Sequence, residues 1–195
     1  MAKPHAAEGD TASMILDVAE RLVQNGGFTG FSYADAAGEL GITKAALHYH
    51  FASKADLGEA LIVRYASRFA AALTTVDDEV AGSLAKLVAY ANLYGDVLRD
   101  HRMCLCGMLA AEYQTLPKPM QDAVVKFFDD NETWLAAVLD QGRHDDTLRF
   151  GGSTQEAARM IIGGLEGAML VARPYGDVDR FQDAADRLLA ALRPQ

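Results

Sequence analysis

The chain has 195 residues, half of them hydrophobic, and a formal net charge of −9 at pH 7. This charge argues against indiscriminate nucleic-acid binding, which rests on a cationic surface. No apolar run approaches the roughly 18 residues of a membrane span, and residues 1–10 lack the apolar segment of a secretory signal. Two cysteines without such a signal are typical of the reducing cytosol, so we expect a cytoplasmic protein.

The first predicted helix runs from about Thr11 to Asn25 and follows a disordered tail over residues 1–10. Its apolar residues recur every three or four positions, which is the spacing of one helix face. Two glycines follow Asn25 and are expected to end the helix.

Residues 31–57 predict two short helices joined by a tight turn. Ser32 can cap the first helix, with Asp35 three residues further on, as in an acidic variant of the capping box. Gly41 falls in the turn, where glycine accepts a positive φ at no steric cost. Thr43 can cap the second helix. This spacing is typical of a helix-turn-helix, whose second helix presents polar and aromatic side chains to the major groove of DNA.

The same stretch resembles a known family. The run Thr43-Lys-Ala-Ala-Leu-His-Tyr-His-Phe51, followed by Ser53-Lys54 and Leu57, is similar to the signature of the TetR family of transcriptional repressors, over roughly residues 12–65. Two positions depart from the usual pattern, since His48 stands where tyrosine is more frequent and Ala45 where glycine is frequent. The resemblance implies a set of DNA-binding residues: Thr43, Lys44, Ala45 and Tyr49 near bases or their phosphates, and His48, His50 and Lys54 on backbone phosphates. The alternative is that these are ordinary solvated side chains.

The charge of the N-terminal part is in tension with DNA binding. Residues 1–65 contain five Lys or Arg and eight Asp or Glu residues. Because salt screens charges beyond about 8 Å, local placement matters more than the sum. No acid lies between Glu39 and Asp56, whereas two lysines and two predicted helix N-termini do. We therefore expect specific, salt-sensitive binding with few non-specific contacts.

The rest of the chain also reads as helix. No stretch alternates with period two, so we expect an all-α fold of about nine helices: an N-terminal three-helix bundle with the helix-turn-helix over residues 11–53, then a larger domain over residues 54–195. By resemblance, the larger domain binds ligand and dimerises. The further helices are expected at Lys54–Leu73, Val80–Leu98, Cys104–Tyr113, Met120–Gln141, Thr154–Ala172 and Val178–Leu192.

Small residues mark one of these helices as a packing surface. The segment Ile161–Val171 contains Gly163, Gly164 and Gly167. Glycine inside a helix costs about 1 kcal/mol relative to alanine, so this density suggests close helix approach. The resemblance implies a homodimer formed by the last two long helices of each copy. The alternative is a helix buried within one subunit.

Soft and aromatic side chains, together with two carboxylates, suggest an effector pocket. Glu112 and Glu166 lie among apolar neighbours, and a buried carboxylate is costly without a partner. Each could pair with Arg102, Arg159 or a histidine, or face a polar group of a ligand. The aromatic residues and methionines are equally compatible with plain core packing. The predicted lining is Tyr94, Met103, Cys106, Met108, Glu112, Tyr113, Phe127, Trp134, Glu166 and Met169.

Cys104 and Cys106 lie two apart on a predicted helix, so they point to different sides and form a poor zinc site. The simplest interpretation is that both are small buried hydrophobes. A neighbouring His101 or Arg102 could instead lower a thiol pKa. The segment weakly resembles the NemR-like branch of the family, which senses electrophiles and oxidants.

Three classes of function compete. The first is a ligand-responsive DNA-binding repressor, in which a small molecule shifts a dimer away from the shape that fits its operator. The second is a helical ligand-binding protein without an operator. The third is an enzyme with a Cys–His pair, such as a cysteine with His101 or His144, which the absence of a glycine-rich loop or nucleophile elbow disfavours. We expect double-stranded DNA, a small effector and a second copy as partners, with no catalytic residue, cofactor, metal or membrane contact.

Overall fold

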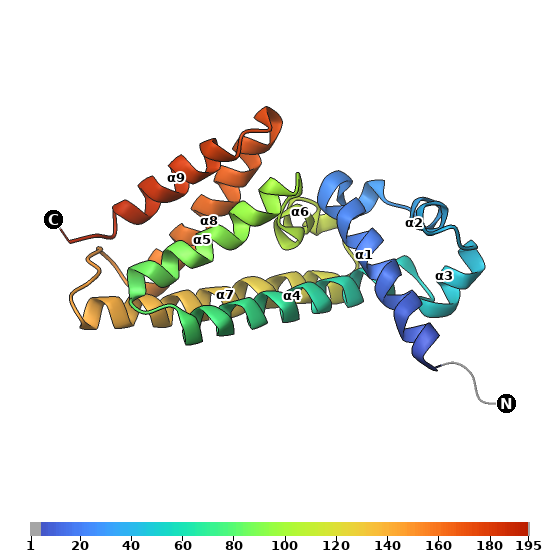
Figure 1. The fold of residues 1–195 in the computed structure, drawn as a ribbon, viewed down its shortest axis with the longest axis horizontal. Helices are drawn as coiled ribbons and strands as arrows, with labels where there is room; N and C mark the ends of the chain where they lie inside the picture. The colour runs from blue at the N-terminus through green and yellow to red at the C-terminus, as the bar shows by residue number, and fades with distance from the viewer. Residues whose placement is uncertain (1–4, 195) are drawn as a thin grey trace. The chain divides into compact units, whose positions relative to one another are not determined.

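The computed structural model describes residues 5–194, with side chains from residue 11 onward. Within this range it contains nine α-helices, two short 3-10 helices and no strand (Figure 1), which confirms the all-α prediction. The helices are α1 His5–Gly30, α2 Tyr33–Leu40, α3 Lys44–His50, α4 Lys54–Glu79, α5 Ser83–Arg99, α6 Leu105–Ala111, α7 Lys118–His144, α8 Thr154–Ala172 and α9 Val178–Ala190, with η1 Tyr113–Thr115 and η2 Arg173–Tyr175.

The described chain forms two compact units. The first runs up to Ala66 and also includes Leu105–Val124, so α6 and the start of α7 belong with the first three helices. The second consists of Ser67–Cys104 and the chain from Val125 onward. The boundary that the sequence predicts between a DNA-binding and a ligand-binding domain, at residue 54, stays a prediction. The compact units themselves change inside α4, before α6 and inside α7.

The N-terminal helix is longer than predicted. It begins at His5, within the expected tail, while residues 1–4 lie outside the described residues. Near its end Gly27 leaves the helical conformation with φ of 80°, and Phe28 follows as a buried side chain. A Cβ at Gly27 would collide with Oε1 of Glu112, so both the backbone and the close approach require glycine.

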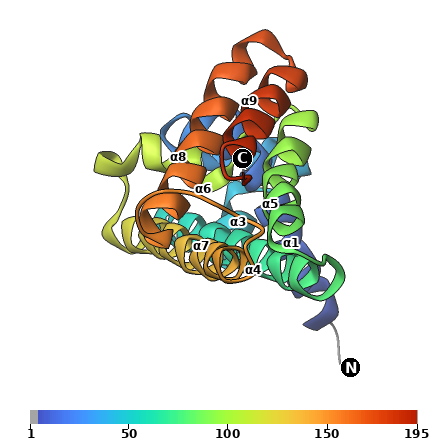
Figure 2. The ribbon, with the colours of Figure 1, turned by 90° about the vertical axis from the view of Figure 1, so that its left-hand side faces the viewer.

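In the second unit, α5, α8 and α9 pack against one another, as both ribbon views show (Figure 2). Aromatic rings from α4, α5 and α7 form a cluster in this unit. The rings of Tyr90 and Trp134 stack with centroids 5.6 Å apart, and Phe69 meets Tyr90, Tyr94 and Phe127 edge-on at 5.3–6.0 Å. Such pairs add to the free energy of burial beyond their area alone.

The sequence prediction ended two helices early. The fourth helix continues to Glu79, and buried Val76 shows that its apolar face extends past Leu73. The seventh runs from Lys118 to His144. Across the described residues, no helix combines the length and the apolar composition needed to cross a membrane.

Candidate functional site

The turn between α2 and α3 has the conformation that the sequence predicts. The Ser32 side chain accepts a hydrogen bond from the backbone N–H of Asp35, and the Asp35 carboxylate accepts one from the N–H of Ser32 at 2.8 Å. The Ser32 hydroxyl also donates to that carboxylate at 2.7 Å, and this bond, followed by the one from the Ser32 N–H, holds the pKa of Asp35 below its usual value. Gly41 ends α2 in the left-handed region, with φ of 65°. The chain can therefore reverse here without steric strain.

The next helix, α3, presents one face to solvent. Thr43 caps it through a hydrogen bond from the N–H of Ala46, and its first turn contains no acidic residue. Leu47 is fully buried, whereas the side chain of Tyr49 is 74% exposed. The predicted contact residues follow the same division, because Thr43, Lys44, Ala45, His48 and Tyr49 are exposed and His50 is half-buried.

The side chain of Tyr33 anchors the C-terminal end of α3, a role that the sequence did not reveal. Its hydroxyl donates to the backbone oxygens of Phe51 at 3.0 Å and of Ser53 at 2.6 Å. Burial, with Asp56 nearby, raises the pKa of Tyr33 to about 12, so the hydroxyl keeps its proton. The Tyr33 ring also contacts the ring of His48, with centroids 4.6 Å apart. The C-terminal end of α3 is thereby held against the bundle.

His48 is oriented as well as exposed. Its Nδ1 lies 3.2 Å from the backbone oxygen of Ala52. Because that oxygen only accepts, Nδ1 must carry a proton, and Nε2 can donate to a phosphate only when the imidazole is doubly protonated.

Lys54 stands at the first position of α4 and is half-buried. Its ammonium lies 4.5 Å from the centre of the Phe28 ring and 5.4 Å from that of Phe31. Burial lowers the pKa of Lys54, and the nearby Glu112 and Asp35 carboxylates oppose that shift. The cation is therefore positioned by aromatic faces rather than freely extended.

The acids around this surface are engaged within the protein. Asp56 forms a capping box with Ser53 at the start of α4, with hydrogen bonds of 2.9 and 3.1 Å. Glu39 pairs with Arg21. The N-terminus of α4, predicted as a phosphate site, thus already holds a carboxylate, while that of α3 does not.

Glu112 binds to the far end of α1. Its Oε2 accepts hydrogen bonds from the backbone N–H and the hydroxyl of Thr29, each at 2.8 Å. Both groups lie in the first unit. This predicted pocket carboxylate therefore has protein donors.

The predicted pocket residues divide between the two units. Cys106, Met108, Glu112 and Tyr113 belong to the first unit, and the other six to the second. Half of them are tightly packed: Tyr94, Met103, Cys106, Phe127 and Met169 are each at most 2% exposed. Trp134 lines a hollow of about 290 Å³, where its indole N–H donates to Asp77 at 2.8 Å.

Glu166 differs from the other acids. Its Oε1 is buried and accepts no hydrogen bond from any described residue, while the thiol of Cys104 donates a hydrogen bond to the carboxylate. Burial raises the pKa of Glu166 to about 7, against the smaller effect of that thiol. The cations that the sequence suggested as partners have others, since Arg159 contacts Glu132 and Arg102 contacts Asp100.

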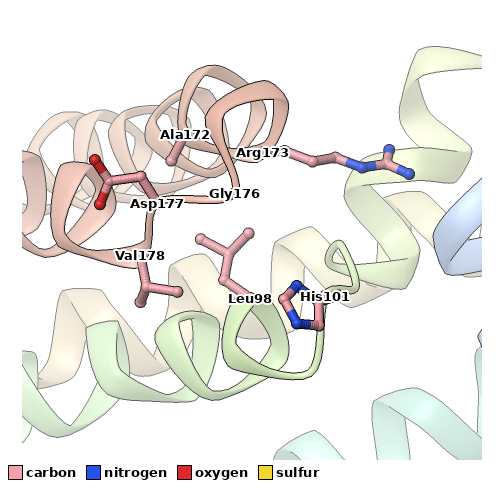
Figure 3. A pocket seen from close by; sticks show the side chains of 7 residues that line it. All are labelled: Leu98, His101, Ala172, Arg173, Gly176, Asp177 and Val178. Atoms are coloured by element: carbon pink, nitrogen blue, oxygen red, sulfur yellow. The ribbon is translucent and has the colours of Figure 1, made fainter.

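A further cavity was missed by the sequence analysis. It has a volume of about 170 Å³ and lies beyond the end of α5, where Leu98 and His101 face the turn that leads into α9 (Figure 3). None of the predicted pocket residues lines it. The helix-breaking run from Arg173 to Gly176 marks the turn in the sequence, but no sequence pattern marks the hollow. Its lining is Leu98, His101, Ala172, Arg173, Gly176, Asp177 and Val178.

The exposed side of α8 is apolar from Met160 onward. Met160, Leu170 and Val171 are among the large hydrophobic side chains that face solvent. A Cβ at Gly163 or Gly167 would meet no atom within 4 Å, whereas one at Gly164 would collide with Leu188 of α9. Gly164 therefore allows close packing against α9, whereas Gly163 and Gly167 lie on a surface that is open in the single chain. The open residues recur at helical spacing and form a continuous stripe: Met160, Gly163, Gly167, Leu170 and Val171.

Two family models match the chain. One, described as bacterial regulatory proteins of the tetR family, matches residues 15–61. The other, described as the C-terminal domain of tetracyclin repressor-like proteins, matches residues 83–188. A comparison with curated proteins finds no match.

Solved structures are similar along almost the whole chain. A TetR-family transcriptional regulator from Agrobacterium tumefaciens is 31% identical, with a TM-score of 0.93, over 96% of this chain and all of that one. A TetR transcriptional regulator from Legionella pneumophila is 30% identical, with a TM-score of 0.85, over 99% of this chain and all of that one. The reduced form of E. coli NemR shares the fold at 23% identity and a TM-score of 0.81, over 94% and 97% of the two chains.

Proposed function

We propose, from the premise that the chain belongs to the TetR family of bacterial regulatory proteins, that it is a repressor released from a palindromic operator by a small molecule. As a member of this family it is a ligand-responsive DNA-binding transcriptional regulator. The observation that carries the proposal is the exposed face of α3. This short helix is anchored by buried Leu47 and Tyr33, yet leaves Lys44 and Tyr49 in solvent.

The residues of this face are suited to different parts of DNA. We assign base edges and adjacent phosphates to Thr43, Lys44, Ala45 and Tyr49, because hydroxyl, ammonium and phenol groups supply donors in the major groove. His48, His50 and Lys54 are assigned to backbone phosphates. The contacts of Lys54 with Phe28 and Phe31 support this role, since they fix the place of the charge.

Two copies are needed, because one short helix reads few base pairs. Half-sites one helical turn apart, about 34–36 Å, match two-fold related reading helices. TetR-family proteins form dimers, and we place this chain's dimer surface on α8 and α9. The stripe on α8 supports this placement, because Gly163 and Gly167 allow close approach of a partner helix.

Release requires that the effector prefer a dimer shape that does not fit the operator. We propose that effector binding in the C-terminal region displaces the helix that begins at Lys54 and changes the separation of the reading helices. A coupling free energy of roughly 1–3 kcal/mol is typical of such regulators. The protein would act in the cytoplasm, where its operator lies.

Selection of bound duplexes from a random pool tests the proposal. The wild-type protein is expected to enrich a two-fold symmetric sequence whose affinity falls steeply with salt. The Tyr49→Ala variant is expected to keep its melting temperature and to lose preference for that sequence, because Tyr49 is exposed. Enrichment of no sequence by the folded wild-type protein would favour the alternative, a ligand-binding helical protein without an operator.

A further inference from the structure

The carboxylate of Glu166 is enclosed by groups that do not satisfy it. It belongs to α8, one of the helices packed on α5 in the second unit. Its Oε1 is buried and accepts no hydrogen bond among the described residues. A buried carboxylate oxygen without a donor destabilises the folded state. Among the described residues, the packing of the second unit therefore gives no reason for a carboxylate at position 166.

The nearby hydroxyl groups have already committed their protons. The Tyr90 hydroxyl donates to Oδ1 of Asn131 at 3.1 Å, and the amide of Asn131 donates to the backbone oxygen of Phe127 at 2.7 Å. Tyr94 must then donate to Tyr90 across their 3.1 Å contact. Both tyrosines lie within electrostatic range of Glu166, and burial raises the pKa of each. Neither hydroxyl has a proton left for the carboxylate.

No cation of the described chain compensates the charge. The groups that act on Glu166 are the thiol of Cys104, which donates to the carboxylate, and the hydroxyls of Tyr90 and Tyr94, whose raised pKa values keep them neutral at pH 7. Beside them lies the ring cluster, in which Trp134 stacks on Tyr90. An acceptor without a donor, next to aromatic faces, favours an organic cation, since both the carboxylate and the rings attract positive charge.

We propose that Glu166 recognises a protonated amine on an effector whose apolar or aromatic body packs against the Tyr90–Trp134 ring cluster. This inference rests on the proposed function, because it names the chemical class of the molecule that releases the repressor. The ammonium would donate to Oε1 of Glu166 and remove the cost of its isolation. A carboxylate or phosphate at the same place would be repelled.

Trp134 is the one tryptophan of the chain, so its fluorescence reports on the cluster. The full-length protein is titrated at pH 8 with 2-phenylethylamine, 2-phenylethanol and phenylacetate, and with the corresponding naphthyl compounds. The amines are expected to bind at least tenfold more tightly than the alcohols, and the acids not to bind. Amines that bind no better than the alcohols, or that do not bind, would overturn the proposal.

The isosteric Glu166→Gln variant is expected to lose at least tenfold in amine affinity while alcohol binding stays within twofold. The matched control is Glu79→Gln, which removes one exposed carboxylate from the same unit. An unchanged amine preference in Glu166→Gln would also refute the assignment.

Proton release provides a measurement that needs no variant. An ammonium favours the ionised carboxylate, and burial raises the pKa of Glu166 to about 7, so amine binding near neutral pH should release a fraction of a proton. Calorimetry in pairs of buffers at several pH values from 5 to 8 measures this number, and no release at any of these pH values would contradict the proposal. Operator binding is assayed in parallel: a wild-type protein that binds operator but shows no amine preference refutes only the effector class, whereas failure to bind any operator refutes the regulator function.

Discussion

One carboxylate of the second unit differs from those of the first unit in how its hydrogen bonds are satisfied. In the first unit, Asp35 and Asp56 accept hydrogen bonds at helix N-termini, and Glu112 accepts two from Thr29. In the second unit, Glu166 retains a buried oxygen without a donor. The first unit thus satisfies its acids internally and offers its donors outward, as a DNA-binding surface requires. The second unit keeps an unsatisfied acceptor within, which suits a site that waits for a ligand.

The two units also differ in how readily their functional residues can be recognised from exposure. Most of the residues that we propose to contact DNA are exposed on α3, which Tyr33 and Leu47 hold in place. The residues that we propose to sense a small molecule lie among packed side chains, where binding sites and core packing use the same residue types.

The largest expected effect concerns the open stripe on α8. Gly163→Glu places a charge where a Cβ meets no atom of its own chain, so the protomer should fold but not pair. Losing the second reading helix should weaken operator binding by at least a hundredfold. Light scattering and gel shift measure both quantities. Ala85→Glu, on an exposed position of α5, is the control and should remain dimeric. A dimeric Gly163→Glu protein with normal operator affinity would place the interface elsewhere.

The second prediction concerns pH and the isolated acid. Burial raises the pKa of Glu166 from 4.5 to about 7 in the folded state, so the folded protein holds the proton more tightly than the unfolded chain. Its contribution to stability is therefore complete below pH 4.5 and is lost as the pH rises through 7, a change on the order of 3 kcal/mol. Urea unfolding at pH 5 to 8 should show this decline in wild type and in Glu79→Gln but not in Glu166→Gln. Equal slopes in all three proteins would show that Glu166 is not isolated.

The third prediction concerns the charge on α3. Lys44→Ala removes an exposed ammonium from the first turn of the reading helix. Operator affinity should fall by about tenfold, and the slope of log affinity against log salt should decrease by about one, without a change in melting temperature. Lys126→Ala, which removes an exposed lysine of α7 paired with Asp130, is the matched control. If both variants changed the salt slope equally, α3 would have no special role.

The smallest effect concerns the satisfied acid of the first unit. Thr29→Val removes one of the two donors to Glu112 while the backbone donor remains. The free energy of unfolding should decrease by about 1 kcal/mol. Thr74→Val, whose hydroxyl bonds only a carbonyl of its own helix, provides the comparison in thermal melts. A Thr29→Val protein as stable as wild type would mean that the Glu112 contact contributes little.

The helix-turn-helix could be predicted because its determinants are local. The hydrogen bonds that cap these helices join residues three or four positions apart, so their spacing in the sequence is enough to predict them. The residues concerned are Ser32, Asp35, Gly41 and Thr43. Val76 shows the limit of such patterns, since the surrounding polar residues conceal that α4 continues.

The contacts of the two glutamates could not be predicted in the same way. Glu112 accepts hydrogen bonds from Thr29, which lies 83 residues away in the sequence, and Glu166 accepts one from Cys104, which is also distant. No sequence pattern links the two members of either pair. Both acids have similar apolar neighbours in the sequence, yet one is satisfied and the other is not. Only the packing of distant helices distinguishes a structural carboxylate from a candidate ligand contact.

The account depends on α3 reading DNA from a two-fold dimer, and hydroxyl-radical footprinting on the selected duplex tests this most directly. The wild-type protein is expected to protect two symmetric half-sites whose centres lie one helical turn apart, about 34–36 Å, or a multiple of it. Protection of a single site, or protection that persists unchanged when Lys44 and Tyr49 are both replaced by alanine in a folded dimer, would contradict it.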